Sequence, residues 1–377
     1  MVIERGTIMK KILACLLIGL WFLISLTSCH ERQDLGDQYV FGQDMQYMYW
    51  DGGTSEFTMT ESPDGYYFME GNTIFYMDKS SMEAVPLCNK PDCLHHLETD
   101  PKKVWKCNAY VPTGLESYLF WWNGNLYTVV MFDQNGNQLE HGSLLKISPD
   151  GAQREYLCEL TADPHWAIVH RGKFYYASSV FDESLEPDYQ VKAIDLNNPK
   201  QQEETIFHDH KDGGSIQRLL AYGNHLYINV DYYDNGKSTT ESHEINILTK
   251  EDTIIDSDLK DGKRQMVFGT FLDQKMYVYL MDSTEDGEKT SEEQRTIWSM
   301  DLDGNNRQKA FVMGNEDTYT YVYADQENLY LFTLWAFVEK PEDRFLSMID
   351  KEGKELAKVD LSEIKGSRVT FSPGGEN

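Results

Sequence analysis

The chain has 377 residues, with 34 Lys and Arg against 62 Asp and Glu, and its formal net charge is −28 at pH 7. So acidic a chain repels the phosphate backbone of nucleic acids, and we therefore expect no DNA or RNA partner. Aromatic residues make up 13% of the sequence, which excludes a disordered chain and predicts a large folded core.

The N-terminus has the pattern of a secretory signal peptide. Arg5, Lys10 and Lys11 precede an apolar run over residues 12–26, and a basic stretch followed by a short apolar stretch is typical of export signals. The run holds about 15 residues, fewer than the roughly 20 that cross a bilayer as a helix, so a stop-transfer helix is the weaker interpretation. We expect residues 1–28 to be a signal peptide.

The end of this region predicts a lipid anchor. Leu26-Thr27-Ser28-Cys29 resembles the lipobox of bacterial lipoproteins. That resemblance implies cleavage before Cys29 and a diacylglyceryl group on its sulfur, which would place the protein on the outer face of the cytoplasmic membrane. The alternative is an ordinary cysteine after a cleavable peptide. Residues 29–37 are polar and are expected to form a flexible tether.

A repeat runs through residues 38–377. A short turn followed by an aliphatic and an aromatic residue occurs six times at steps of 48 to 53 residues, and we call this unit the anchor motif; its aromatic residues are Phe75, Tyr127, Tyr175, Tyr227, Tyr277 and Tyr330. Strand-like runs flank each motif, and most units continue to an Ile/Met–Asp/Ser step such as Ile194-Asp195. About four strands per repeat, without an amphipathic helix, predict an all-β fold, a β-propeller of four-stranded blades.

The number of blades depends on how the ring closes. Residues 368–377 match the first strand and turn of another repeat, and residues 38–60 contain further strand-like runs. We predict about seven blades, with the last blade combining an inner strand from the C-terminus and outer strands from the N-terminus, because such closure removes exposed sheet edges. A six-bladed ring, or a chain that stops early, is the alternative.

A cysteine- and histidine-containing insertion is expected over residues 87–110. Cys88, Cys93, His95 and Cys107 could form a structural CCHC zinc site. Outside the membrane the thiols could instead oxidise, and a Cys88–Cys93 disulfide or a bond to Cys107 would hold this insertion. With Cys158, the number of cysteines after Cys29 is four, which permits two disulfides. Free thiols are the third alternative, and the sequence names no other cofactor.

The insertion also carries a family resemblance. The stretch from Cys88 to His95, with Cys107-Asn108-Ala109 after it, resembles a motif of uncharacterised Firmicutes-type lipoproteins with a β-propeller domain. With the repeats, the resemblance covers nearly the whole mature chain. It implies the propeller fold and the membrane location but no chemistry.

Other candidate sites have simpler interpretations. Two calcium-like stretches, residues 133–137 and 301–305, lack the glutamate expected at the twelfth position and are interpreted as hairpin turns. His208-Asp209-His210 could bind a metal but is interpreted as a solvated loop. Aromatic pairs such as Trp121-Trp122 and Tyr232-Tyr233 are interpreted as packing contacts in preference to sugar-stacking sites. We name no catalytic residue.

The favoured function is a lipid-anchored binding or scaffold module for a protein, peptide or glycan. The alternative is an extracellular glycan-active enzyme, a lyase or hydrolase, using the central funnel. Titratable side chains that converge at one mouth of the channel with shifted pKa values would favour the enzyme. A purely structural role would instead predict an exposed apolar patch.

Overall fold

The computed structural model describes residues 35–46, 57–95, 102–103, 106–113, 117–181, 187–210, 214–234, 237–255, 264–282, 296–312, 320–333 and 345–361. The predicted signal peptide, Cys29 and the tail at 368–377 lie outside these residues. Within them, no helix has the length and apolar character of a membrane span.

The first three blades follow one another along the chain. Blade 1 contains β1 (Phe57–Glu61), β2 (Gly65–Glu70), β3 (Thr73–Asp78) and β4 (Ala84–Pro86). Blade 2 contains β5 (Phe120–Trp122), β6 (Asn125–Phe132), β7 (Gln138–Ile147) and β8 (Arg154–Glu159). Blade 3 contains β9 (Trp166–His170), β10 (Lys173–Phe181), β11 (Pro187–Asp195) and β12 (Glu204–Asp209).

The other three blades have the same plan. Blade 4 contains β13 (Gly214–Tyr222), β14 (His225–Asp234), β15 (Lys237–Asn246) and β16 (Asp252–Ile254). Blade 5 contains β17 (Arg264–Leu272), β18 (Lys275–Asp282), β19 (Thr296–Asp301) and β20 (Gln308–Val312). Blade 6 contains β21 (Thr320–Ala324), β22 (Leu329–Thr333), β23 (Phe345–Ile349) and β24 (Glu355–Asp360).

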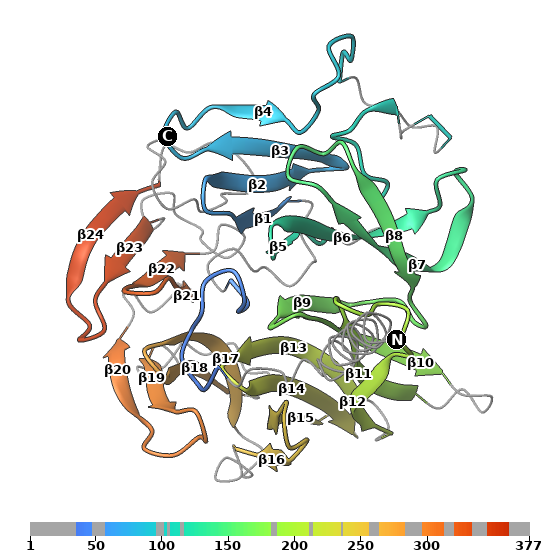
Figure 1. Cartoon of the computed structure of the whole chain (residues 1–377). Helices are drawn as coiled ribbons and strands as arrows, with labels where there is room; N and C mark the ends of the chain where they lie inside the picture. The colour runs from blue at the N-terminus through green and yellow to red at the C-terminus, as the bar shows by residue number, and fades with distance from the viewer. Residues whose placement is uncertain are drawn as a thin grey trace, which may run out of the picture. The chain divides into compact units, whose positions relative to one another are not determined.

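These blades confirm the predicted all-β propeller. The described residues form six blades, as in the six-bladed alternative, and not the predicted seven. Each sheet in the described part of the chain has four antiparallel strands in sequence order. Figure 1 shows the sheets arranged as a ring with the first strand of each blade innermost. From β1 to β21, each inner strand contacts that of the next blade.

The predicted mixed closing blade is not among these six sheets. Residues 57–61, expected among its outer strands, form β1, which pairs with β2 and lies at the inner edge of blade 1. Every described sheet is built from consecutive strands, so none joins the two ends of the chain. A strand-like run in the sequence predicts a strand but not the strand that it pairs with, because pairing depends on contacts between residues distant in sequence.

Five of the six anchor motifs lie between the first and second strands of a blade, as the repeat predicts. The first motif, at residues 71–75, lies between β2 and β3. In blade 1 the equivalent turn is Ser62–Gly65, and Tyr67 takes the place of Tyr127 as the third residue of the second strand. A Gly-Asn turn suits any tight hairpin, so the motif alone does not tell which hairpin it closes.

The repeated aromatic residue is a buried contact between blades. The six equivalent side chains are all buried: Tyr67, Tyr127, Tyr175, Tyr227, Tyr277 and Tyr330. Tyr227 donates its hydroxyl to the Leu302 carbonyl in blade 5 at 3.1 Å, and Tyr67 donates to the Pro149 carbonyl in blade 2 at 3.1 Å. A buried phenol needs a hydrogen-bond acceptor, and for these two tyrosines a carbonyl of the next blade provides it.

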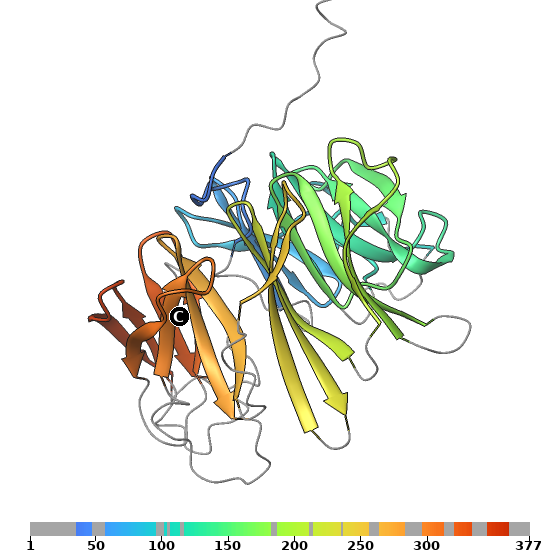
Figure 2. The same ribbon diagram turned by 90° about the horizontal axis from the view of Figure 1, so that it is seen from below.

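A short stretch before blade 1, residues 37–46, lies across the middle of one face of the ring (Figures 1 and 2). We call it the N-terminal segment. The side chain of Gln46 bonds to Glu61 in blade 1, and that of Gln43 accepts a bond from Trp122 in blade 2. The backbone amide of Asn224 in blade 4 donates to Asp37. The segment therefore bridges several blades; no strand forms within it.

Candidate functional site

The N-terminal segment is fixed to blade 3 by a buried ion pair. Arg171 Nε lies 2.7 Å from Asp44 Oδ1, and the two side chains are 5% and 0% exposed. The remaining guanidinium nitrogens donate to Asn224 Oδ1 at 2.7 Å and to the Gln38 carbonyl at 3.0 Å. The pair is thus both desolvated and hydrogen-bonded, which buried charges require.

The backbone at Arg171 has an unusual conformation for its residue type. Arg171 has a φ of +47° and Gly172 one of +76° in the turn between β9 and β10. The equivalent turn of blade 2 is Asn123-Gly124, with φ values of +45° and +75°. Asparagine tolerates this region far better than arginine, so the contacts of the guanidinium outweigh the local strain.

His170 continues the same attachment. Its Nδ1 accepts the Met45 amide at 3.1 Å, and its Nε2 lies 2.8 Å from the Gly223 carbonyl. Acceptance at one ring nitrogen and donation at the other fit a neutral imidazole. The segment is therefore held by specific bonds from two successive residues of blade 3.

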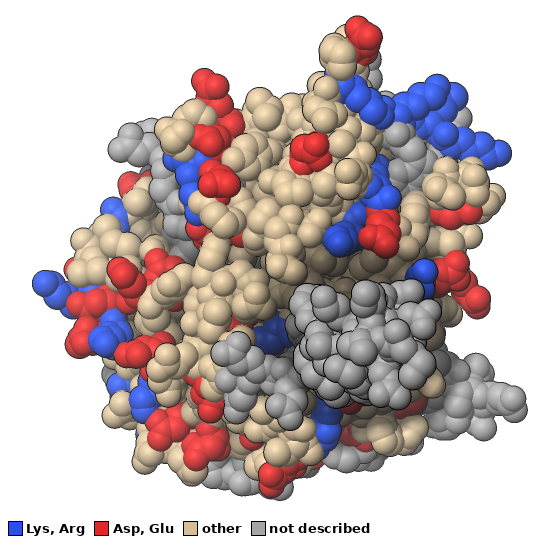
Figure 3. Space-filling model, in the orientation of Figure 1, with Lys and Arg blue, Asp and Glu red and all other residues tan. Residues whose placement is uncertain are grey.

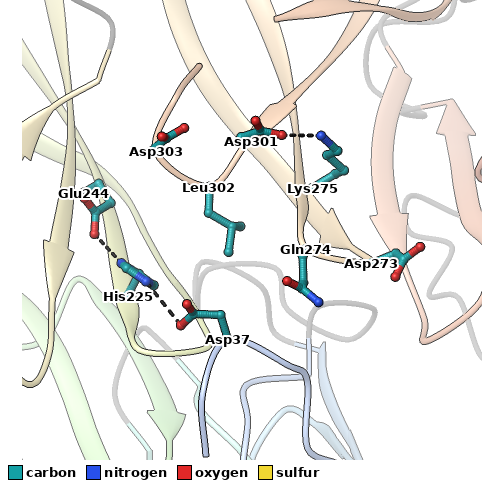
Figure 4. A pocket seen from close by; sticks show the side chains of 9 residues that line it. All are labelled: Asp37, His225, Glu244, Asp273, Gln274, Lys275, Asp301, Leu302 and Asp303. Carbon is teal, nitrogen blue, oxygen red and sulfur yellow. Dashed lines mark hydrogen bonds and ion pairs between the residues drawn. The ribbon is translucent and has the colours of Figure 1, made fainter. Parts of the chain in front are cut away.

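Beside the N-terminal segment lies an acidic pocket of about 580 Å³ between blades 4 and 5. Figure 4 shows its side chains, which come from the segment, from the start of β14, from β15 and from two turns of blade 5. Five carboxylates, one lysine and one histidine line it, with Gln274 and Leu302: Asp37, Glu244, Asp273, Asp301, Asp303, Lys275 and His225. This excess of negative charge suits a cationic ligand.

His225 is held between two carboxylates of the pocket. Its Nδ1 bonds to Glu244, and its Nε2 lies 3.2 Å from Asp37 Oδ1. Burial alone would lower the pKa of His225, but Glu244 and Asp37 outweigh it and raise the pKa above its ordinary value. The imidazole therefore favours its charged form, in which both ring nitrogens donate.

Lys275 forms an ion pair with a carboxylate of the pocket. It bonds to Asp301, and this bond, with one from Asn306, lowers the pKa of the Asp301 carboxyl. Asp273 lies 3.0 Å from Lys351 Nζ, in a pair that is largely exposed. Asp303 accepts the Asn305 amide in its own turn. Asp303 is therefore oriented within its own turn, whereas lysine side chains orient Asp273 and Asp301.

Sequence reasoning did not predict this pocket, because its residues come from separate repeats. Asp37 was assigned to the tether, and Asp301 and Asp303 only to a turn, which they do form. One local signal was available: His170-Arg171-Gly172 replaces the Asn-Gly type of turn used by blade 2. A charged residue at a turn position that demands positive φ indicates a tertiary contact.

The four predicted metal ligands come together. One ligand atom from each of Cys88, Cys93, His95 and Cys107 lies within 4.8 Å of all the others. Cys107 Sγ is 3.7 Å from His95 Nδ1, and the Asn108 amide donates to Cys88 Sγ at 3.4 Å. The thiols are not bonded to one another in this structure. We call these four residues the Cys/His cluster.

The cluster is attached to blades 1 and 2 at both ends. Leu87 donates its amide to the Ile74 carbonyl at 2.9 Å, and Ile74 donates to the Ala109 carbonyl at 2.8 Å. Arg154 in β8 donates to the carbonyls of Cys107 and Asn108. Burial lowers the pKa of Arg154 to about 10. These bonds fix the backbone on either side of the four ligands.

The two ends of the cluster differ in acidity. Burial raises the pKa of Cys88, but backbone hydrogen bonds from Lys90 and Asn108, with bonds to neighbouring thiols, bring it below its ordinary value. Burial raises the pKa of Cys107 to about 11, with a further contribution from its bond to Cys93. Cys88 therefore gives up its proton more readily than Cys107.

Cys158 does not belong to the cluster. It lies in β8 and packs against apolar side chains of blades 2 and 3, whereas Cys88 and Cys107 pack against those of blades 1 and 2. Burial raises the pKa of its thiol to about 11. The even number of cysteines that suggested two disulfides therefore does not correspond to one spatial group.

The other candidates follow the simpler interpretations in part. Asp133 accepts the amides of Asn135 and Asn137, both at 2.8 Å, so its carboxylate is used within the turn. His208 and His210 are exposed, but the predicted loop is wrong for the first two residues, because His208 and Asp209 form the end of β12. A ligand atom of each histidine lies within 4.8 Å of one on Asp188. The third member of that group is therefore not Asp209, which bonds to Tyr232.

Few large apolar side chains in the described part of the chain are exposed. Trp122 and Tyr232 are buried, as packing predicts. Among the described residues, the large exposed apolar side chains include Val85 in β4 and Val359 in β24, each 51% exposed, both on outer strands. These two positions lie on different blades.

Comparisons with known proteins give distant structural likenesses and no family. No family model and no curated protein matches the sequence. A solved prolyl endopeptidase is 12% identical with a TM-score of 0.48, covering 85% of this chain and 43% of its own. A puromycin hydrolase is 9% identical with a TM-score of 0.47, covering 85% and 48%. The chain spans less than half the length of either hydrolase.

Proposed function

We propose that the protein is a lipid-anchored β-propeller that binds a basic segment of a protein or peptide at the outer face of the cytoplasmic membrane. The observation that carries the proposal is the acidic pocket between blades 4 and 5. The sequence left protein, peptide and glycan ligands open. The charge of the pocket favours the first two, because lysine and arginine side chains supply the complementary charge.

The volume of the pocket and its negative charge suit such a ligand. Its volume of about 580 Å³ is that of a small-ligand site and admits long basic side chains. The net charge of −28 adds a long-range attraction that speeds the approach of a cationic partner. Leu302 offers an apolar surface to the methylene groups of a lysine or arginine.

The lipid anchor would keep this face near the membrane. Asp37, which lines the pocket, is eight residues after Cys29. An extended chain covers at most about 3.5 Å per residue, so eight residues reach about 28 Å. We infer that the partner is presented within that distance of the bilayer.

Replacing Cys29 tests the anchor. The wild-type chain should partition into the detergent phase after membrane extraction, and its mature N-terminal peptide should carry a diacylglyceryl mass on Cys29. Cys29→Ala should lack that mass and partition into the aqueous phase. A Cys29→Ala chain that stays in the detergent phase would show that another element holds the protein to the membrane.

An oligolysine peptide tests the pocket. Asp273→Asn with Asp303→Asn removes two pocket charges, and Asn tolerates the backbone at both turns. Asp133→Asn with Asp195→Asn removes two turn carboxylates elsewhere. Two screened charges are worth about 1 kcal/mol each, so the pocket variant should bind about tenfold or more weakly. Equal weakening in the control pair would mean that binding reflects overall charge alone.

One observation favours the alternative, a glycan-active enzyme. His225 bonds to carboxylates through both ring nitrogens and has a raised pKa, which is one arrangement for acid–base chemistry. Under the binding proposal, His225→Gln removes a positive charge from the pocket, so it should not weaken oligolysine binding and should leave glycan turnover at the background level. Glycan hydrolysis or elimination that His225→Gln abolishes would favour the enzyme instead.

A further inference from the structure

We propose that Cys88, Cys93, His95 and Cys107 bind one zinc ion, which holds residues 87–111 against blades 1 and 2. Three thiolates and an imidazole fill all four positions of a tetrahedral ion. No position is left open for water or substrate, so the site is structural. This inference is independent of the acidic pocket.

The geometry agrees with a tetrahedral ion. Zinc binds sulfur at about 2.3 Å and imidazole nitrogen at about 2.0 Å, which places neighbouring ligand atoms about 3.5 Å apart. Cys107 Sγ and His95 Nδ1 are 3.7 Å apart, and all four ligand atoms lie within 4.8 Å of one another. Small side-chain rotations close the remaining gap.

The position of His95 beside the thiols favours a zinc site over a disulfide. A disulfide uses two of the three thiols and gives no reason for an imidazole beside the third. His95 has a φ of +52°, a conformation that side chains seldom adopt, while its ring approaches Cys107. Cys158 packs against a different group of apolar residues, so it does not complete a second bridge.

The described residues between the first ligands have little apolar contact of their own. Asn89, Lys90, Pro91 and Asp92 are exposed, and Leu94 is 75% exposed. The buried apolar residues that the structure describes in this segment lie at its ends, at Leu87 and at residues 109–111. A bound metal can replace a hydrophobic core in so short a stretch, since the binding free energy then stabilises the fold.

Basic residues surround the cluster. Lys90, Lys102, Lys103 and Lys106 are all exposed, and Figure 3 shows lysine and arginine gathered at this edge of the ring. Lys90 Nζ donates to the Lys106 carbonyl at 2.6 Å. A zinc ion with three thiolates and one neutral imidazole carries a charge of −1, which these side chains offset.

Metal content measured on the intact chain tests the proposal. The full chain is purified without chelator or reductant and examined by native mass spectrometry and elemental analysis. One zinc per chain is expected. A chain without zinc that is lighter by two hydrogens, or a reduced chain that takes up no added zinc, would overturn the proposal.

Matched variants locate the metal. Cys107→Ser should lose the zinc, whereas Cys158→Ser should keep it, because only Cys107 belongs to the cluster. His208→Ala with His210→Ala removes the other candidate ligands and should also leave zinc bound. Zinc retained by Cys107→Ser, or lost from the histidine variant, would contradict the assignment.

A measurement on the wild-type chain covers the case in which Cys107→Ser fails to fold. Chelation should remove the zinc and expose residues 88–107 to proteolysis at a lower Tm, and added zinc should reverse both changes. Cleavage and Tm that do not change on loss of zinc would refute the structural role.

Discussion

Arg171 shows how a single side chain attaches the N-terminal segment to the propeller. Its backbone has a positive φ, which arginine rarely adopts, and its ion pair with Asp44 is almost fully buried. Removing either charge leaves the other buried without its counter-charge, which is costlier than the pair itself. The residue is therefore expected to be far more sensitive to substitution than an ordinary turn residue.

Arg171→Ala should lower the free energy of unfolding by about 3–5 kcal/mol, because Asp44 would remain charged and buried. Denaturant unfolding measures the change. Arg171→Met with Asp44→Asn should cost less than the sum of the single changes. The exposed Lys354→Ala is the control and should stay within about 0.5 kcal/mol. An equally small effect at Arg171 would show that the pair does not hold the segment.

His225 predicts a pH dependence with a defined sign. Glu244 and Asp37 raise its pKa in the folded chain above that in the unfolded chain. Its contribution to stability is then fully present below the ordinary histidine pKa of about 6.5 and is lost as the pH rises through the raised value. The difference in Tm between wild type and His225→Gln should therefore shrink from pH 6 to pH 9. A constant or growing difference would contradict the assigned contacts, and the exposed His165→Gln serves as control.

At the scale of elements, the hairpins were the part that the sequence predicted best. A turn followed by an aliphatic residue and tyrosine marks the second strand of blades 2 to 6, because the tyrosine must be buried between blades. The Asp at the end of the third strand, or just after it, could also be predicted, since a carboxylate such as Asp195 or Asp350 accepts the amides of its own turn. Both signals depend only on residues close in sequence.

Contacts between repeats could not be predicted in the same way. The pocket joins Asp37 to residues near 225, 273 and 301, and the ion pair joins Asp44 to Arg171. None of these pairs has a fixed spacing, so one sequence alone does not reveal them. The Cys/His cluster was predictable because its ligands lie within one insertion.

Two glycines allow the cost of backbone strain in a turn to be distinguished from the cost of displacing the N-terminal segment. Gly223 and Gly71 have nearly equal φ values of +57° and +56°. A methyl group at Gly223 would lie 2.7 Å from Asp37 Cα, whereas at Gly71 it would meet nothing within 4 Å. Gly71→Ala should cost about 1–2 kcal/mol from the backbone alone.

Gly223→Ala should cost more than Gly71→Ala, because it also displaces Asp37. Limited proteolysis should then cut within residues 37–46 faster than in the wild type or in Gly71→Ala. The acidic pocket would lose one of its carboxylates, so oligolysine binding should weaken in parallel. Equal stability and equal cleavage of the two variants would mean that the segment is not seated on this turn.

At the scale of the whole molecule, repetition and charge act together. Six blades, each with a buried tyrosine, form the ring. Four of the five pocket carboxylates come from blades 4 and 5, close to turns on one face. The segment that leads to Cys29 lies on that same face and supplies Asp37. The proposed anchor and the proposed binding site are thus linked through about eight residues of chain.

Site-specific photo-crosslinking in native membranes tests the central claim most directly. A photoreactive residue replaces Leu302 in the pocket, and the control replaces Leu356, which is 46% exposed on the outer strand of blade 6. The account predicts a discrete protein or peptide adduct from position 302 that free oligolysine competes away and that Asp273→Asn with Asp303→Asn diminishes. Adducts of equal yield from both positions, or a position-302 adduct that oligolysine and the pocket substitutions leave unchanged, would contradict it.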